Sequence, residues 1–148
     1  MTVETVSKNP KEKKTANPGT SARKNVVTDF FRLVAEGRPR DGLKYFAPDC
    51  VQHNPYIKGG MDVLLDGMVA ARKDNASKIT QPDFRLRYVL EDGDVVAVYT
   101  QLLYNRSRPE TGGLRQVHLF RFGGDKIVEY WDITQPIDES MTNATCAY

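Results

Sequence analysis

The chain has 148 residues, of which 40% are hydrophobic, and this size and composition fit one globular domain with its own core. The formal net charge of +2 comes from residues 1–20, which hold four lysines and two glutamates, so that 17 basic and 17 acidic residues remain in the rest of the chain. A neutral body argues against a nucleic-acid-binding surface, and no apolar run is long enough for a membrane span.

The composition of residues 1–20 predicts a disordered leader, because they contain almost no large apolar side chain. Cys50 and Cys146 are the two cysteines, and they are not at metal-ligand spacing. We interpret them as reduced thiols of a cytoplasmic protein.

Three helices are predicted in the first half of the chain. Ser21 is a suitable N-cap for a helix over 22–36, in which apolar residues recur at helical spacing. A short second helix is predicted within 41–46, and a third helix over 61–75 follows two glycines. A short strand over 50–53 is predicted between them.

From residue 83 the apolar period changes from 3.6 to 2, which indicates strands. We predict strands over 83–90, 95–104, 114–122 and 126–135, in two hairpins whose turns contain Gly93 or Gly123-Gly124. The domain is then expected over residues 21–137, followed by a C-terminal tail over 138–148. Helices followed by a strand meander predict an α+β fold, in which a curved antiparallel sheet forms a cone against three helices and encloses a pocket.

The strand over 114–122 carries polar side chains on its predicted inner face. Alternation places Gln116, His118 and Phe120 on one side, away from the two arginines on the other side. A three-residue loop over 123–125 would pair Phe122 with Lys126. That register sets His118 opposite Tyr130 and Gln116 opposite Asp132, with His118 and Asp132 as diagonal neighbours.

A histidine and a carboxylate on an apolar concave surface can do general acid–base chemistry. The alternative is a satisfied polar pair inside the core, without any chemistry. A metal site made by His53, His118 and Asp132 is a further alternative. These three residues are not at motif spacing, so we predict no metal.

Several segments resemble the SnoaL-like polyketide cyclases of the nuclear transport factor 2-like superfamily, over roughly residues 21–137. They are Val51-Gln52-His53-Asn54-Pro55, Gly59-Gly60, Gly93-Asp94-Val95-Val96-Ala97-Val98, His118-Leu119-Phe120-Arg121 and Lys126-Ile127-Val128-Glu129-Tyr130-Trp131-Asp132. The resemblance implies the cone-shaped α+β fold. It is less specific for activity, because one fold carries many functions.

In that family an aspartate on the last strand is the acid and base of an aldol closure, without metal or cofactor. The resemblance matches Asp132 to this aspartate and His118 to a supporting histidine. Gln116, His53 and Asn54 match polar positions near the pocket. Tyr45, Tyr88, Phe120 and Tyr130 are our candidates for the pocket wall.

The hypothesis is a cofactor-free enzyme that cyclises or isomerises a hydrophobic carbonyl compound, with Asp132 as general acid/base and His118 supporting it. The alternative is a non-catalytic small-molecule-binding or assembly domain on the same fold. An enzyme should show a closed apolar cavity with Asp132 at its base, and a binding or assembly domain should show the cavity filled or widely open.

A homodimer is also predicted, because one sheet face carries exposed apolar side chains that need a cover. These side chains are Val117, Leu119, Trp131 and Ile133.

Overall fold

The computed structural model describes residues 20–143. Nearly all of the predicted leader and the last five residues of the predicted tail therefore lie outside the described residues. The elements in chain order are α1 (Ala22–Ala35), the 3₁₀ helix η1 (Pro39–Tyr45), β1 (Phe46–Gln52), α2 (Met61–Asp74), β2 (Asp83–Asp92), β3 (Val95–Leu103), the short 3₁₀ helix η2 (Pro109–Thr111), β4 (Gly113–Gly123) and β5 (Lys126–Ile137).

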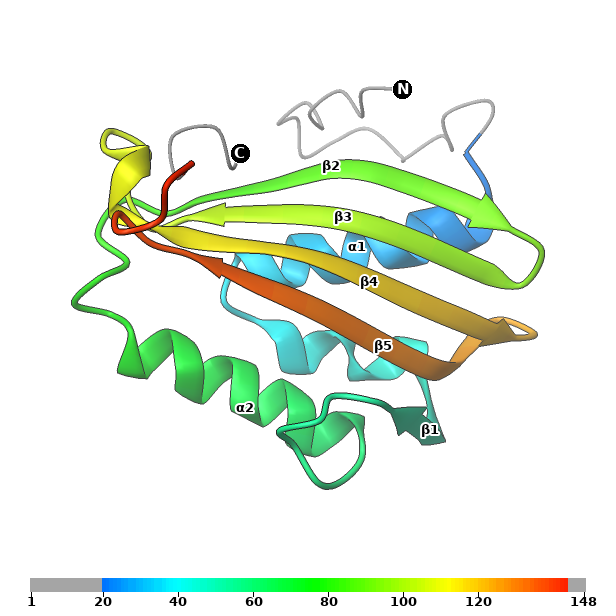
Figure 1. The fold of residues 1–148 in the computed structure, drawn as a ribbon. Coiled ribbons are helices and arrows are strands. Elements are labelled where there is room, and N and C mark those ends of the chain that lie inside the picture. Colours follow the sequence, from blue (N-terminus) through cyan, green and yellow to red (C-terminus); the bar gives the residue numbers. More distant parts are fainter. Residues whose placement is uncertain (1–19, 144–148) are drawn as a thin grey trace, which may run out of the picture.

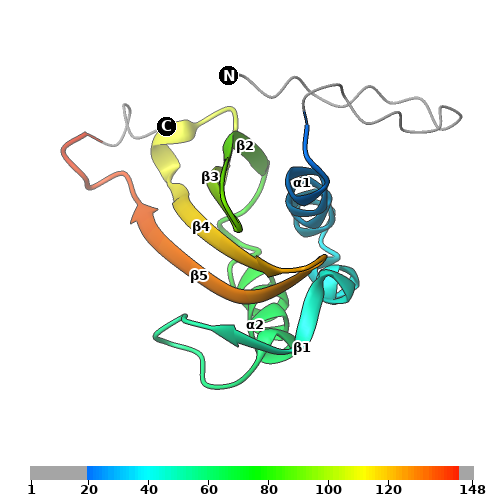
Figure 2. The ribbon, with the colours of Figure 1, turned by 90° about the vertical axis from the view of Figure 1, so that its right-hand side faces the viewer.

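The five strands form one curved sheet in the order β1-β5-β4-β3-β2. Strands β2 to β5 are an antiparallel meander, as predicted, whereas β1 pairs with β5 in parallel, so the sheet is mixed rather than wholly antiparallel. Figure 1 shows α1 and η1 behind the meander, with α2 alongside the edge formed by β5 and β1, and Figure 2 shows the bend of the strands. The predicted α+β fold is confirmed.

The boundaries of α1 follow from its end residues. The Ser21 hydroxyl accepts a hydrogen bond from the Lys24 backbone N–H at 3.1 Å, so Ser21 is the N-cap that the sequence predicts. Gly37, just past the helix, has a φ of 77°, a conformation that glycine adopts without a Cβ clash. The second helix is a 3₁₀ helix rather than an α-helix, and it begins at Pro39.

Aromatic side chains of α1 fill the space under one end of the sheet. The Phe30 ring packs edge-on against Phe46 and Phe120, with centroids 5.3 and 5.9 Å away. Gly42 of η1 sits so close to Phe30 that an added Cβ would lie 2.5 Å from the ring atom Cδ2. The core at this end is therefore densely packed.

Register shifts in β2 and in β5 separate the observed strand pairing from the predicted one. In β2 the pairing with β3 shifts between Leu86 and Tyr88, so Arg87 is an extra residue. Leu86 packs against the core, whereas Tyr88 and Leu90 are 51% and 63% exposed. The uniform alternation predicted for this strand is therefore wrong beyond Leu86, because a bulge moves each later side chain to the other face.

The hairpin of β4 and β5 has a shorter loop than predicted. Gly123 pairs with Lys126 and Phe122 pairs with Ile127, and the register shifts again before Arg121 pairs with Glu129. As a result His118 lies opposite Asp132, rather than opposite Tyr130. The predicted register is wrong by two residues, which keeps His118 and Asp132 on one face, since side chains alternate with period two.

Within residues 20–143, no helix has the length and apolar character that crossing a membrane requires. The cytoplasmic location expected from the thiols stays a prediction.

Candidate functional site

A cavity of about 430 Å³ lies between the C-terminal halves of α1 and α2 and the inner face of the sheet. Its size is in the range of small-molecule sites. Most of its lining is apolar and comes from α1, α2 and β2 to β4, together with Ile79 and Pro82 of the segment between α2 and β2. Residues at its rim, such as Ala35 and Ala71, are exposed, so the cavity opens to solvent.

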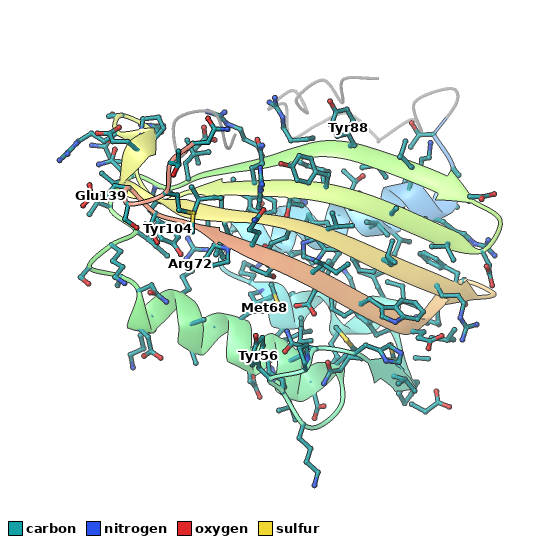
Figure 3. All side chains as sticks on the ribbon, viewed as in Figure 1. Tyr56, Met68, Arg72, Tyr88, Tyr104 and Glu139 are labelled. Atoms are coloured by element: carbon teal, nitrogen blue, oxygen red, sulfur yellow. The ribbon has the colours of Figure 1, made fainter. Side chains whose placement is uncertain are left out.

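Five polar side chains line this cavity: Arg72, Asn75, Asp83, Tyr104 and Gln116. Gln116 donates an N–H to Thr134 Oγ1 at 2.8 Å, and no described residue bonds to its Oε1. Tyr104, Asn75 and Arg72 stand nearer the outer ends of their elements. Figure 3 shows Arg72 and Tyr104 at the same end of the molecule, with Met68 nearer the N-terminus of α2. A ligand there would meet an apolar wall with a few polar contacts.

His118 lies in the core beside the cavity, and it is 3% exposed. Its Nδ1 shares a hydrogen bond with the Tyr130 hydroxyl at 2.8 Å, and its Nε2 shares one with Thr100 Oγ1 at 3.1 Å. The ring also packs edge-on against Phe31, with centroids 4.8 Å apart. Both ring nitrogens are thus occupied by protein groups, and His118 is not a cavity-lining residue.

Burial fixes the charge states of this network. It lowers the pKa of His118 from 6.5 to about 3, since an apolar surrounding disfavours the imidazolium. Burial, and then the charge of Asp132, raise the pKa of the Tyr130 hydroxyl well above its ordinary value. Near neutral pH both groups are uncharged, so one ring nitrogen of His118 donates a proton and the other accepts one.

Asp132 is half-buried on the inner face of β5. Asn54 donates its Nδ2–H to Asp132 Oδ2 at 2.8 Å, which fixes the orientation of the carboxyl group. The other oxygen, Oδ1, is buried and has no hydrogen-bond partner among the described residues. Asp132 does not line the cavity, but it is the diagonal neighbour of Gln116, which does. Diagonal neighbours in such a pair lie about 7–8 Å apart between Cα atoms.

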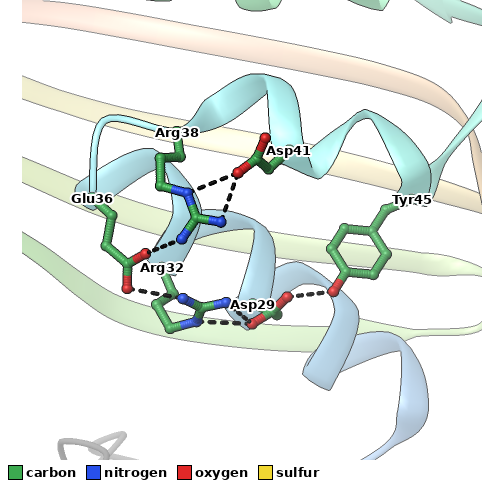
Figure 4. Close-up of polar contacts among 6 residues, drawn as sticks. All are labelled: Asp29, Arg32, Glu36, Arg38, Asp41 and Tyr45. Atoms are coloured by element: carbon green, nitrogen blue, oxygen red, sulfur yellow. Dashed lines mark hydrogen bonds and ion pairs between the residues drawn. The ribbon is translucent and has the colours of Figure 1, made fainter.

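Of the four predicted wall residues, Tyr45 faces away from the cavity. Its hydroxyl donates a hydrogen bond to Asp29 of α1, in the polar network that Figure 4 shows on the surface of α1 and η1. Burial and the bond to Asp29 raise the pKa of Tyr45 to about 12. The side chain therefore fastens η1 to α1.

The other three predicted wall residues do not line the cavity either. Tyr88 is on the outer face because of the bulge in β2, and its ring stacks on Tyr99 at 6.1 Å. Phe120 and Tyr130 are on the inner face but are buried within the aromatic core. Sequence alternation assigns a face, but it does not tell a cavity wall from a filled core.

His53 and Asn54 are adjacent in sequence but have different surroundings. Asn54 contacts Asp132, whereas His53 stacks on Trp131 at 4.8 Å and its Nε2 lies 2.8 Å from Glu129 Oε2. Trp131 and Glu129 alternate with Asp132 and belong to the outer face. His53 is therefore not a neighbour of His118. No group of three His, Cys, Asp or Glu side chains in residues 20–143 could hold a metal ion.

Sequence reasoning missed Arg72, Tyr104 and Met68, which all line the cavity. Met68 and Arg72 are four residues apart, a spacing that places them on one face of α2. This signal was available, but it did not show that this face of the helix borders an open space.

The buried His118 predicts a loss of stability in acid. Below about pH 6.5 the unfolded chain binds a proton at this histidine, but the folded chain does not until about pH 3. The free energy of unfolding should therefore fall as pH falls through this window, by up to about 1.4 kcal/mol per pH unit. Urea unfolding of wild type and His118→Gln at a series of pH values measures this, because the variant lacks the titrating group.

His53→Gln is the matched control, since His53 is the only other histidine and is partly exposed. Carboxylates titrate in all three proteins, so only the difference in slope counts. If His118→Gln and wild type lose stability in parallel between pH 6.5 and pH 4, His118 is not the group responsible.

Comparisons with known proteins place the fold and the family. The family model described as "SnoaL-like domain" matches residues 27–130. AclR, a candidate hydroxylase from Streptomyces galilaeus, has a similar structure, with a TM-score of 0.61 and 16% identity over 76% of this chain and 88% of that chain. A candidate polyketide cyclase from Sinorhizobium meliloti has a TM-score of 0.56 and 17% identity over 77% of this chain and 100% of that chain.

An NTF2-like protein of unknown function from Burkholderia xenovorans has a TM-score of 0.58 and 15% identity over 86% of this chain and 93% of that chain. No curated protein matches the sequence. At these identities the solved structures establish the fold, and the family model covers more than half of the chain. The chain therefore belongs to the SnoaL-like family and has the NTF2-like fold.

Proposed function

We propose that this protein binds a small, mostly apolar molecule in the cavity between α1, α2 and the sheet. The observation that carries the proposal is the cavity of about 430 Å³ with apolar walls and few polar groups. The aromatic core occupies the other end of the concave face. The similar proteins described as a candidate hydroxylase and a candidate polyketide cyclase support a small organic molecule as the ligand class.

A tryptophan at the cavity rim should block this binding. Ala71 is exposed on α2 and lines the cavity, so Ala71→Trp would place an indole in the opening. Ala70, one residue earlier, is exposed and does not line the cavity, which makes Ala70→Trp the matched control. Thermal shift with a panel of apolar ketones and acids should give stabilisation of wild type and Ala70→Trp, and none of Ala71→Trp. Equal stabilisation of both variants would place the ligand elsewhere.

Catalysis is the second candidate function, and the orphan oxygen of Asp132 favours it. A buried carboxyl oxygen without a partner costs free energy unless a ligand supplies a proton or a hydrogen bond. Asn54 holds the other oxygen and so aims the free one. Such a group can serve as the base of a cofactor-free aldol-type cyclisation or isomerisation of a hydrophobic carbonyl compound.

In such a reaction one carboxylate can both take up the proton and return it. Asp132 would take a proton from the carbon beside a carbonyl group, and the electron pair would move onto the carbonyl oxygen as an enolate. In a cyclisation the enolate carbon would bond to a second carbonyl carbon, whose oxygen would take the proton back from Asp132. Gln116 would hydrogen-bond the enolate oxygen. His118 would act indirectly, because it is neutral and buried, and it would hold the Tyr130 hydroxyl near Asp132.

Asp132→Asn should lower the turnover rate of any carbonyl substrate by about a hundredfold to ten-thousandfold, because an amide does not accept and return a proton. Binding should survive, since the two side chains are nearly isosteric. Asp125→Asn, at the exposed hairpin turn, is the matched control and should keep full activity. Once a substrate is found by thermal shift, the rate is measured directly. Wild-type turnover by Asp132→Asn would leave the binding proposal standing and remove the catalytic one.

We also propose that the protein is a homodimer through the outer face of the sheet. That face exposes Ile133 and Val117 at 64% and 38%, next to Leu119 and Trp131. Ile133→Glu should shift a dimer toward monomer in light scattering at micromolar concentration, because a charge would be buried without a partner. Val63→Glu, which changes an exposed valine on α2, is the control and should leave the dimer unchanged. A wild-type monomer contradicts the proposal.

A further inference from the structure

The cavity holds one cationic side chain among its lining residues, the guanidinium of Arg72. It stands on the last turn of α2, at the exposed rim. The rest of the lining is mainly apolar, so this charge is the strongest single polar feature that a bound molecule would meet. What it pairs with therefore bears on which molecules the cavity accepts.

Arg72 has no carboxylate partner among the described residues. Six other arginines form ion pairs with Asp or Glu side chains: Arg32, Arg38, Arg40, Arg85, Arg108 and Arg121. Asp83 also lines the cavity, but it pairs with Arg85 Nη2 at 2.7 Å. The charge of the Asp83 carboxylate is therefore already compensated, whereas the charge of Arg72 is not.

The protein contacts of Arg72 use only a part of its donors. Its Nη1 approaches Val34 O and Ala35 O at 3.4 and 3.5 Å, which are long for hydrogen bonds. A guanidinium carries five N–H donors in a planar fork, and none from Nε or Nη2 is used by a described residue. These contacts cap the C-terminus of α1 weakly and leave the fork free for a planar anion.

A second donor among the lining residues lies at the same end of the molecule as Arg72. Tyr104, just past β3, lines the cavity, and no described residue bonds to its hydroxyl. Partial burial raises the pKa of this phenol, so it stays protonated and can donate a hydrogen bond. Arg72 and Tyr104 lie at one end of the molecule in Figure 3, whereas Gln116 is the fourth residue of β4 and lines the cavity farther in along the sheet.

We propose that the cavity selects a carboxylate-bearing apolar molecule, whose carboxylate binds the Arg72 guanidinium and the Tyr104 hydroxyl at the rim while its apolar body lies between α1, α2 and the sheet. A planar fork of donors matches a carboxylate in a way that a point charge does not. The inference rests on the proposed binding function of the cavity and adds the ligand's charge to it. It does not depend on catalysis by Asp132.

Matched ligand pairs test the charge. Decanoate, 4-phenylbutyrate and 2-naphthylacetate are each compared with their own primary amide, which has the same body and no charge. Isothermal titration calorimetry near neutral pH should give the acids about tenfold tighter binding than the amides, the effect expected of a charge-assisted hydrogen bond. Added salt should weaken the binding of the acids and leave the binding of the amides unchanged, because salt screens a charge at an exposed rim.

Matched variants assign the preference to Arg72. Arg72→Gln should bind acid and amide equally, at the affinity of the amide for wild type, and Arg72→Lys should keep only a part of the preference because it lacks the fork. Tyr104→Phe should lose a smaller part of the preference for the acid over the amide. Arg40→Gln removes an arginine that is paired with Asp66 and does not line the cavity, so its preference should be that of wild type.

Three outcomes decide the inference. If wild type binds acids and amides equally, or if Arg72→Gln keeps the preference, the carboxylate inference is wrong and the cavity still binds apolar molecules. If Arg72→Gln lowers only the thermal midpoint of the free protein, Arg72 is a cap of α1 and nothing more. If no acid or amide binds wild type at all, while Ala71→Trp and Ala70→Trp behave alike, the proposed binding function fails together with this inference.

Discussion

The packing of two phenylalanines of α1 against the inner face of the sheet divides the concave side into two unequal parts. Phe30 and Phe31 meet Phe120 edge-on at 5.9 and 5.8 Å, and these rings belong to the buried core at one end. At the other end, where α1 and α2 terminate, the cavity lies between the two helices and the sheet. The place of the cavity thus follows the distribution of large aromatic residues along α1.

The same packing decides what His118 can do. A histidine between Phe31 and the sheet, with both nitrogens bonded, is held neutral by its surroundings. It therefore neither supplies a proton near neutral pH nor contacts a molecule in the cavity. Its bonds to Thr100 and Tyr130 satisfy three buried polar groups at once, on three neighbouring strands. The reading of His118 as part of a satisfied core network, left open by the sequence, describes its contacts better than that of a catalytic side chain.

How far the sequence predicts this structure depends on the kind of signal. Local signals were sufficient for the helices, since Ser21 and the apolar stripe of α1 lie within a single element. The antiparallel meander of β2 to β5 followed from alternation and turn residues, but the parallel pairing of β1 with β5 did not. The bulge at Arg87 and the extra residue near Val128 have no strong local signature, and they changed the face of Tyr88 and the partner of His118. The cavity itself depends on contacts between distant elements, so its Arg72 and Tyr104 were not predicted.

The distance between Asp132 and the cavity bears on how binding and chemistry relate in this protein. Gln116 borders the cavity, and its diagonal neighbour Asp132 has a buried oxygen without a described partner. A molecule held at the rim by Arg72 would extend along the inner face toward Gln116, and its far end would be the part closest to Asp132. A ligand could therefore bind to Arg72 without any contact with Asp132. Chemistry at Asp132, in contrast, would need a ligand long enough to extend past Gln116. On these two proposals, the length of the bound molecule, rather than its charge, would decide whether it reaches Asp132.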